Sequence, residues 1–289
     1  MEPRVAIILV NYNGCKDTIE CVQSLLEITY QNYTIFVVDN ASTEEKRVQD
    51  NLLLQRNVRI LQSNANLGFS GGNNLAIQVA IKEGFDYILL LNNDTIVEAD
   101  FLSELIHTAE RDREIGIVAG KIYFYHDKQR IWAAGGEYSR ITGITVQYGG
   151  EEREELNRPR DLTFATGCLM LIPCHVVEKV GLLEEKLFLY SEDTDYCQRV
   201  LDAGYRIRYV PTAKIYHKIS ASIGDASAVQ QRYMMRNNLY MIQKYSKRKI
   251  VAYLSIMIQT IKDIIRKRKN VVPTVHGIWD YVRRRDGKI

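Results

Sequence analysis

The chain has 289 residues, of which 46% are hydrophobic and 25% charged, and its formal net charge is +3. This composition is typical of a globular protein with one large or two modest domains, and it excludes a disordered or fibrous chain. Five cysteines form no Cys-x-x-Cys pair, which argues against a zinc site or a disulfide framework and favours a reducing, cytoplasmic setting.

Strand-like and helix-like segments alternate through the first 123 residues. The expected strands are residues 5–10, 34–38, 58–62, 87–91 and 116–123, and the expected helices are residues 15–26, 44–55, 73–83 and 101–111. Such alternation predicts an α/β protein with a Rossmann-like, mainly parallel sheet whose faces are covered by helices.

The fourth expected strand ends abruptly in Asn92, Asn93 and Asp94. Five consecutive apolar residues before them suit a strand that is buried on both faces, and ligands bind at the carboxyl ends of such strands. Asp94 can therefore bind a divalent cation together with substrate phosphates, but the same three residues can also form a simple turn. The segment alone leaves both interpretations open.

Polar residues also follow the first three strands, in residues 11–14, 39–43 and 64–74. Carboxylates and amides can bind a base and a ribose, and glycines let the backbone approach a diphosphate, although each segment is also what a turn requires. No Gly-x-Gly-x-x-Gly follows the first strand and no suitable Gly-Lys-Ser/Thr is present, which disfavours a dinucleotide-dependent oxidoreductase and a P-loop enzyme.

The second half of the chain is less regular. Residues 131–150 predict hairpins or an ordered loop, and the charged residues 151–160 predict a mobile segment. Later expected elements are a strand at 162–172 that threads back through the sheet, a helix at 191–203 ended by Gly204, short strands at 206–210 and 214–217 separated by Pro211, and a helix at 230–244.

Three carboxylates crowd the start of the helix expected at 191–203. Glu192, Asp193 and Asp195 can complement the helix dipole, and Asp195 can pair with Arg199 one turn later. Their mutual repulsion can instead raise a pKa and produce a general base. His217, at a strand end, is either a structural histidine or a metal ligand.

The basic charge is concentrated in the tail. Residues 244–289 contain 13 Lys and Arg and 3 Asp and Glu, a balance of +10, which leaves −7 for residues 1–243. The apolar segment 250–265 is too short to span a bilayer, which takes about 20 residues, but it can form an amphipathic helix. Such a helix either rests on an anionic membrane or packs on the main domain with a solvated basic face.

Together these segments resemble family 2 of the inverting nucleotide-sugar glycosyltransferases with the GT-A fold, particularly bacterial rhamnosyltransferase-like members. The motifs are VNYNG at 10–14, VVDNAST at 37–43, NLGFSGGNN at 66–74, LLLNNDTIV at 89–97, ATGCLMLI at 165–172, FLYSEDTDYCQR at 188–199 and YVPTAKIYHKISAS at 209–222. They follow the family's order over residues 1–240, and they are specific for fold and reaction type but not for the sugar.

The resemblance implies a GT-A domain at 1–243, with a nucleotide-binding half at about 1–115 and an acceptor and catalytic half at 116–243, followed by a basic helical extension at 244–289. The candidate nucleotide-binding residues are Asn11, Asn13, Asp39, Asn66, Gly68, Asn73, Asn92 and Asn93. Asp94 and His217 are the candidate ligands of Mn²⁺ or Mg²⁺. Asn92 replaces the first carboxylate of the family's Asp-x-Asp motif, so we expect metal binding to depend on the nucleotide.

Asp193 matches the family's catalytic base, with Glu192 beside it, and the candidate acceptor-binding residues are Trp132, Gly167 and Cys168. The implied reaction moves a sugar from dTDP-rhamnose or a UDP-sugar to a hydroxyl of a glycan or polyprenyl-linked glycan in cell-surface polysaccharide synthesis. We expect a cytoplasmic enzyme that the tail can hold on the inner face of the membrane.

Three other functions compete with this one. The first is a noncatalytic nucleotide-sugar or glycan binding protein on the same fold. The second is a nucleotidyltransferase, which is disfavoured because no Gly-rich loop with Arg and Lys lies near the first strand. The third is nucleic-acid binding through the tail, which ranks last because the basic residues alternate with aliphatic rather than stacking aromatic side chains.

Overall fold

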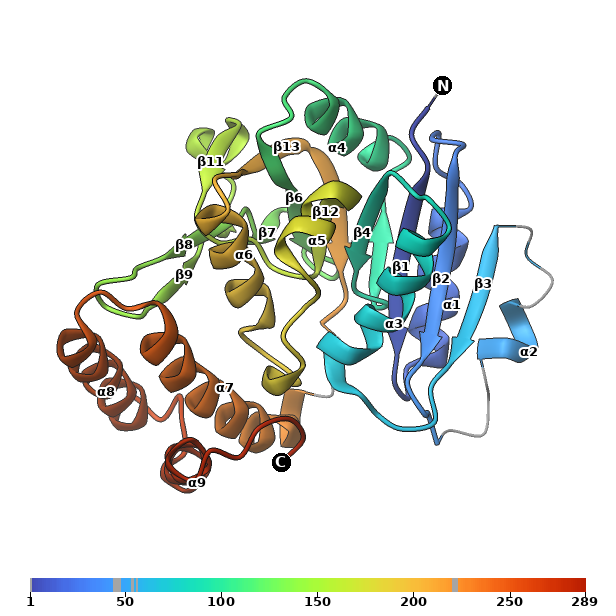
Figure 1. Cartoon of the computed structure of the whole chain (residues 1–289). Helices are drawn as coiled ribbons and strands as arrows, with labels where there is room; N and C mark the ends of the chain where they lie inside the picture. Colours follow the sequence, from blue (N-terminus) through green and yellow to red (C-terminus); the bar gives the residue numbers. More distant parts are fainter. Residues whose placement is uncertain (1, 44–47, 53–54, 56, 220–222) are drawn as a thin grey trace.

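The structure is a computed structural model that describes residues 2–43, 48–52, 55, 57–219 and 223–289. Figure 1 shows a twisted sheet with helices on both faces and a group of helices from the end of the chain packed to one side. The α/β class predicted from the sequence is confirmed.

Four parallel strands form the first half of the sheet. They are β1 (Val5–Asn11), β2 (Tyr33–Asp39), β3 (Val58–Gln62) and β4 (Tyr87–Leu91), in the spatial order β4-β1-β2-β3. The helices are α1 (Cys15–Leu25), α2 (Val48–Leu52), α3 (Gly68–Lys82) and α4 (Phe101–Glu110), with α1 and α4 on one face and α3 on the other. Every residue of β4 is buried, as its apolar sequence predicts. Of the helix expected at 44–55, residues 44–47 and 53–54 lie outside the described residues.

Parallel pairing brings the carboxyl ends of these strands to one edge. Asn11 of β1 is aligned with Asp39 of β2, and Asp39 is aligned with Gln62 of β3. The polar segments that follow the strands therefore meet at this edge, as the sequence predicts.

The second half of the sheet is mixed. β12 (Leu169–Pro173) lies antiparallel between β4 and β6 (Ile115–Phe124). The strand expected to thread back through the sheet at 162–172 therefore forms, but only from residue 169 on. β13 (Arg206–His217) runs parallel to β6, and it also pairs with β5 (Thr95–Val97) and β11 (Arg160–Leu162). The helices α5 (Cys174–Val180) and α6 (Glu192–Asp202) share a core with α3.

Paired strands and a short helix occupy residues 130–162. β7 (Arg130–Ala133) pairs with β6 and with β10 (Gly150–Glu151), and β8 (Gly136–Tyr138) pairs with β9 (Thr145–Gln147). The segment 151–160, predicted to be mobile, instead contains the 3-10 helix η1 (Glu154–Asn157). Lys121 is 1% exposed and donates to Glu152 and Asn157 of this segment. Since a buried ammonium requires such partners, the prediction of a mobile segment is wrong.

Two element boundaries also differ from the predictions. α3 begins at Gly68 rather than at residue 73, because Gly72 lets the helix pack closely on β1: a Cβ there would lie 2.8 Å from Val10 Cγ1. β13 continues through Pro211 instead of breaking there. Pro211 falls in the register irregularity between Val210 and Lys214, where the missing amide hydrogen costs no regular ladder bond.

The tail forms two helices that dock on α7 (Ile223–Tyr245). These are α8 (Lys249–Ile265) and α9 (Val271–Val282). Ala252 and Ile256 of α8 pack against Ile242, while Asp280 of α9 accepts hydrogen bonds from Arg232 at 2.5 and 3.0 Å. In the described part of the chain, no helix combines the length and the apolar character needed to span a bilayer.

Candidate active site

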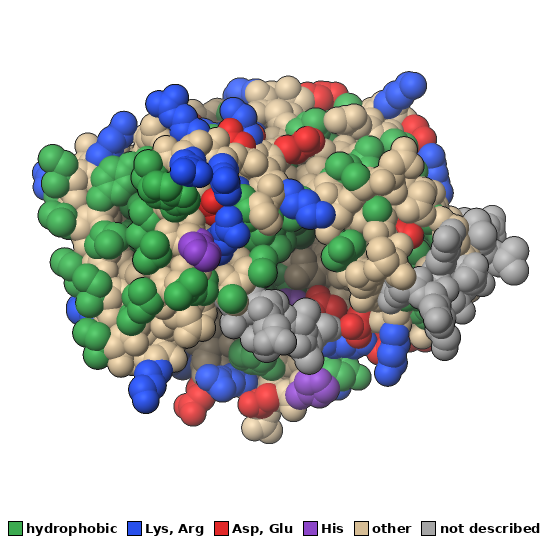
Figure 2. All heavy atoms as spheres, turned by 90° about the horizontal axis from the view of Figure 1, so that it is seen from below, with side chains coloured by type: hydrophobic (Ala, Val, Ile, Leu, Met, Phe, Trp, Pro, Cys, Tyr) green, Lys and Arg blue, Asp and Glu red, His purple; other side chains and the backbone are tan. Residues whose placement is uncertain are grey.

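A hollow opens at the carboxyl edge of β1–β4. Figure 2 looks onto this edge and shows the hollow between the sheet and the C-terminal helices. The residues around it come from the turns after β1, β2 and β4, the start of α3, the turn before β12, the end of β13 and the first turn of α6.

Asn11 joins the turns after β1 and β2. Its Nδ2 donates to Ser42 Oγ at 3.0 Å, and its Oδ1 accepts from Thr18 Oγ1 at 2.9 Å and from the Gly14 amide at 3.2 Å. Asn11 is 0% exposed, and these bonds hold the two turns together. Nucleotide binding by Asn11 stays a prediction.

The start of α3 is fixed by contacts within the protein. Asn73 is 1% exposed and donates to the carbonyl of Phe69 in its own helix, and its contact with the nucleotide stays a prediction. Gly68 has φ +70°, and a Cβ there would lie 2.2 Å from the Phe188 carbonyl. Gly68 is therefore needed for the close approach of residue 188, whose carbonyl accepts from the Phe69 amide at 2.8 Å.

Asn13, Asp39 and Asn66 lie in the turns at the hollow. Asn13 is exposed and accepts from the Thr43 amide at 2.7 Å, and Asp39 accepts from the Ser42 amide at 3.0 Å. Asn66 is half-buried and accepts from the Gly68 amide at 2.9 Å. These bonds fix the turns, and nucleotide binding by the three residues stays a prediction.

The residues of the turn after β4 differ in their contacts. The Asn92 amide donates to the Cys168 carbonyl at 3.1 Å, and Asn93 Nδ2 donates to Thr18 Oγ1 at 2.8 Å. These contacts fix the turn. Asp94, which is 17% exposed at its side chain, lies instead against His217.

Asp94 and His217 approach each other from β4 and β13. Asp94 Oδ1 lies 3.0 Å from His217 Nε2, and the side-chain Nδ2 of Asn92 lies 3.4 Å from the same atom. Two adjacent ligands of an octahedral cation, each at about 2.1 Å, are also about 3.0 Å apart, so this pair fits one edge of such a site. Among the described residues, no cluster of three or more His, Cys, Asp or Glu has metal-binding spacing.

The surroundings of His217 favour its charged form. Burial lowers its pKa, but the neighbouring Cys168 and Asp94 outweigh burial and raise the pKa to about 10. A metal ligand must be neutral, so a cation that binds here has to displace a proton, and its affinity falls with decreasing pH. The ring of Trp132 packs edge-on against His217 with the ring centroids 4.5 Å apart.

Asp193 lies half-buried in the first turn of α6. It accepts from the Gly167 amide at 3.2 Å and from the Thr194 amide at 2.6 Å. Burial raises the pKa of Asp193, although these hydrogen bonds act in the opposite direction. A carboxyl with a raised pKa and partial exposure is suited to accept a proton.

The turn at residues 166–168 joins Asp193 to Asp94 and His217. Gly167 contacts Asp193, and the next residue, Cys168, bonds to Asn92 and lies beside His217. Gly167 is buried and Cys168 is 2% exposed. Acceptor binding by Gly167, Cys168 and Trp132 stays a prediction.

The three acidic residues of α6 occupy three different environments. Asp195 is 0% exposed and binds Arg199 at 2.8 Å and Lys244 at 2.6 Å, which confirms the predicted pair with Arg199. Glu192 is buried, and within the described structure its Oε2 has no hydrogen-bond partner. Burial, followed by the charge of Asp193, raises the pKa of Glu192 well above its usual range.

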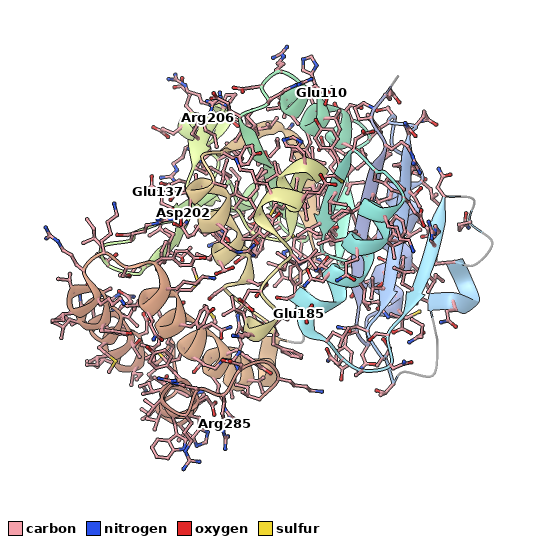
Figure 3. All side chains as sticks on the ribbon, in the orientation of Figure 1. Glu110, Glu137, Glu185, Asp202, Arg206 and Arg285 are labelled. Atoms are coloured by element: carbon pink, nitrogen blue, oxygen red, sulfur yellow. The ribbon has the colours of Figure 1, made fainter. Side chains whose placement is uncertain are left out.

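A strained loop precedes these acids. It links η2 (Glu185–Leu187) to α6, and Phe188, Tyr190 and Ser191 have φ values of 61°, 68° and 70°. Such backbone costs about 1–3 kcal/mol per residue and persists only where its surroundings hold it. Glu185, labelled in Figure 3, ties the start of this segment to α3 by accepting from Asn74 at 2.9 Å.

Two residues of α7 hold this loop. Asn237 Nδ2 lies within hydrogen-bond distance of the carbonyls of residues 187, 189 and 190, at 3.1, 3.0 and 2.6 Å. Arg236 donates to the carbonyls of residues 186 and 187. Both side chains are buried. The sequence analysis missed them, and the available signal was an adjacent arginine and amide within the helix expected at 230–244.

The chain is similar to known glycosyltransferases over most of its length. The sequence model of the family described as Glycosyl transferase family 2 matches residues 6–181. A dTDP-rhamnosyl transferase of Shigella flexneri is 24% identical, with 96% of each chain covered. An N-acetylglucosaminyl-diphospho-decaprenol L-rhamnosyltransferase of Mycobacterium tuberculosis is 25% identical over 75% of this chain and 77% of its own.

The fold also matches a solved structure. A mannosyltransferase of Pyrobaculum calidifontis, in complex with GDP-Man and Mn²⁺, superposes with a TM-score of 0.64 at 13% identity and covers 98% of this chain and 88% of its own. At this identity the likeness concerns the fold.

We expect Glu192→Gln to stabilise the protein at pH 8 by about 1–3 kcal/mol, because it removes a buried carboxylate that has an unpartnered oxygen. Because the pKa of Glu192 is raised in the folded protein, the free energy of unfolding of the wild type increases as the pH falls and Glu192 takes up a proton. The difference in the free energy of unfolding between the variant and the wild type should therefore be largest above the folded-state pKa of Glu192. It should vanish near pH 4.5, the pKa of a glutamate in the unfolded chain. Urea unfolding between pH 8 and pH 4.5 measures it, with exposed Glu114→Gln as control. A gain that does not change with pH would contradict this account.

We expect Asn237→Ala to lower kcat about tenfold or more, because carbonyls of the loop lose their donor and the first turn of α6 is no longer held in place. Steady-state kinetics with saturating substrates measure the loss. The neighbouring Asn238→Ala is the matched control, since Asn238 lies on the same helix and is half-buried. Equal kcat values in the two variants would show that Asn237 does not position the site.

Proposed function

Since the chain belongs to glycosyl transferase family 2, we propose that Asp193 and the Asp94–His217 pair form its reaction centre. The protein is an inverting glycosyltransferase that uses a nucleotide-activated sugar, as its family and its relatives are. The observation that supports the assignment best is the turn at residues 166–168, which contacts Asp193 with one residue and the metal-ligand pair with the next.

Asp193 is the proposed general base. Its carboxylate takes the proton of the acceptor hydroxyl while that oxygen attacks the anomeric carbon from the face opposite the diphosphate, so the configuration inverts. Its raised pKa supports this role, because a base is most efficient when its pKa approaches the working pH. The amides of Gly167 and Thr194 hold the carboxylate in one orientation.

Asp94 and His217 are the proposed ligands of Mn²⁺ or Mg²⁺. A bound cation supplies charge neutralisation for the departing diphosphate. With one carboxylate and one imidazole from the protein, the diphosphate oxygens of the donor would complete the coordination, so cation and nucleotide should bind together. The imidazole supports Mn²⁺ over Mg²⁺.

The proposed division of the chain distributes these roles. The half at about 1–115 contributes Asp94 and the turns proposed to bind the nucleotide, and the half at 116–243 contributes Asp193 and His217. dTDP-rhamnose is the favoured donor because of the Shigella flexneri relative, and a UDP-sugar is the second candidate. The Mycobacterium tuberculosis relative supports a lipid-linked glycan as the acceptor.

A noncatalytic binding protein is the alternative function. Glu192 and Asp193 argue against it, because two adjacent carboxyls with raised pKa values destabilise a fold that has no use for them. Formation of product from a labelled nucleotide sugar separates the two functions.

We expect Asp193→Asn to reduce sugar transfer by a factor of about 10² to 10⁴ while donor binding stays intact, because the amide cannot take the hydroxyl proton. Release of labelled sugar onto the acceptor and thermal stabilisation by the nucleotide are the two measurements. Asp202→Asn, on the same helix and exposed, is the control. If Asp193→Asn transfers sugar at near the wild-type rate, Asp193 is not the general base, and Glu192 becomes the next candidate for that role.

We expect Asp94→Asn to abolish the part of nucleotide binding that depends on Mn²⁺. Melting curves with UDP, dTDP, GDP and CDP, each with and without Mn²⁺, measure this, since a ligand at 100 times its Kd stabilises the fold by about 2.7 kcal/mol. Asp86→Asn, before the opposite end of β4, is the control. An equal response to Mn²⁺ in Asp94→Asn and wild-type protein would remove Asp94 from the metal site, whatever the donor.

A further inference from the structure

The outer side of α8 is apolar although its inner side already packs on α7. The inner side buries Ala252, Ile256 and Thr260. The outer side exposes seven large hydrophobic residues by 37–77%: Ile250, Val251, Leu254, Met257, Ile258, Ile261 and Ile265. An amphipathic helix that only packed on the domain would present polar side chains there.

α9 continues this surface. It buries Pro273, Thr274, Gly277 and Asp280 against α7, and it exposes Val271, Val272, Val275, Trp279 and Val282 by 52–64%. Of the 18 large hydrophobic residues exposed in the described structure, 12 therefore lie on these two helices. We call these 12 residues the outer face. Figure 2 shows hydrophobic side chains gathered on this side of the molecule, next to the hollow.

Cations surround the outer face. Exposed basic residues lie at 247–249 before α8, at 266–268 between the helices and at 283–285 after α9. Arg285, labelled in Figure 3, lies at the lower edge of the helical group. Asp263 is buried and paired with Lys269, and Asp280 is buried and paired with Arg232 and Arg285. Asp286 is the exposed acidic residue beside the group at 283–285, so the cations outnumber the exposed acids.

We propose that the outer face is a docking surface for an anionic lipid bilayer, on which α8 and α9 lie parallel to the membrane plane. Apolar side chains between basic flanks match a lipid surface that is apolar inside and anionic outside. Trp279 is suited to the boundary between the two regions. A second copy of the chain is a poorer partner, because it would bring two tails of +10 together.

The end of the chain connects the helices of the outer face to the segment that leads to the proposed reaction centre. After α9, the Gly287 amide donates to the Lys186 carbonyl at 2.7 Å, and Arg236 donates to the carbonyls of Arg285 and Gly287. Lys186 belongs to the segment that leads to Asp193. A bilayer on the outer face would therefore lie beside the hollow, although the proposal does not depend on the identity of donor or acceptor.

The test is flotation of the full chain with vesicles of phosphatidylcholine, with and without 30% phosphatidylglycerol. We expect partitioning to be at least about tenfold stronger on the anionic vesicles and to weaken as salt rises from about 0.1 to 0.5 M. Comparable binding to neutral vesicles, or none to either, would overturn the proposal.

Two variants separate the apolar and basic contributions. Leu254→Gln/Ile258→Gln/Trp279→Gln and, independently, Arg266→Glu/Lys267→Glu/Arg268→Glu should each reduce partitioning about tenfold or more. Both change exposed residues, and thermal melting checks the fold. Val146→Gln, on an equally exposed residue of β9, is the control and should bind as the wild type does. Concentration-dependent dimers in light scattering that the first variant abolishes would assign the outer face to a second copy instead.

Discussion

The hydrogen bonds from Asn237 and Arg236 to the loop before α6 are the interaction on which the rest of the site depends. Three residues of this loop have positive φ without being glycine, and the two buried side chains donate to carbonyls of residues 187, 189 and 190. On one side the loop touches the start of α3 through the Phe188 carbonyl, and on the other it leads into Asp193. The loop before α6 therefore connects the start of α3, the proposed base Asp193 and the C-terminal helices.

The acidic residues around the hollow show how environment divides roles among identical groups. Asp195 is neutralised by Arg199 and Lys244 and fixes α6 to α7. Asp94 faces an imidazole, which suits a shared cation. Asp193 combines partial exposure with a raised pKa, which suits proton transfer. Spacing in the sequence cannot separate these roles, because it does not report burial or partners.

The sequence predicted the sheet well because its signals are local. Apolar runs that end in polar turns identified β1 to β4 and the edge where they meet, and the colinear motifs identified the family. The errors arise where a distant neighbour decides. Gly72 was expected before the helix until Val10 was placed against it, and the adjacent Arg236 and Asn237 were a weak signal before their acceptors were known. The exposed side of α9 was missed because its inner contacts could not be foreseen.

The position of the outer face beside the hollow has a consequence for how the two substrates arrive. A nucleotide sugar is soluble and diffuses in three dimensions, whereas a lipid-linked acceptor diffuses in the plane of the bilayer. An enzyme held on that plane would meet the two from different phases, at one hollow beside the outer face. Its turnover would then follow the surface density of the acceptor rather than its concentration in bulk, and only the nucleotide would have to enter and leave through water.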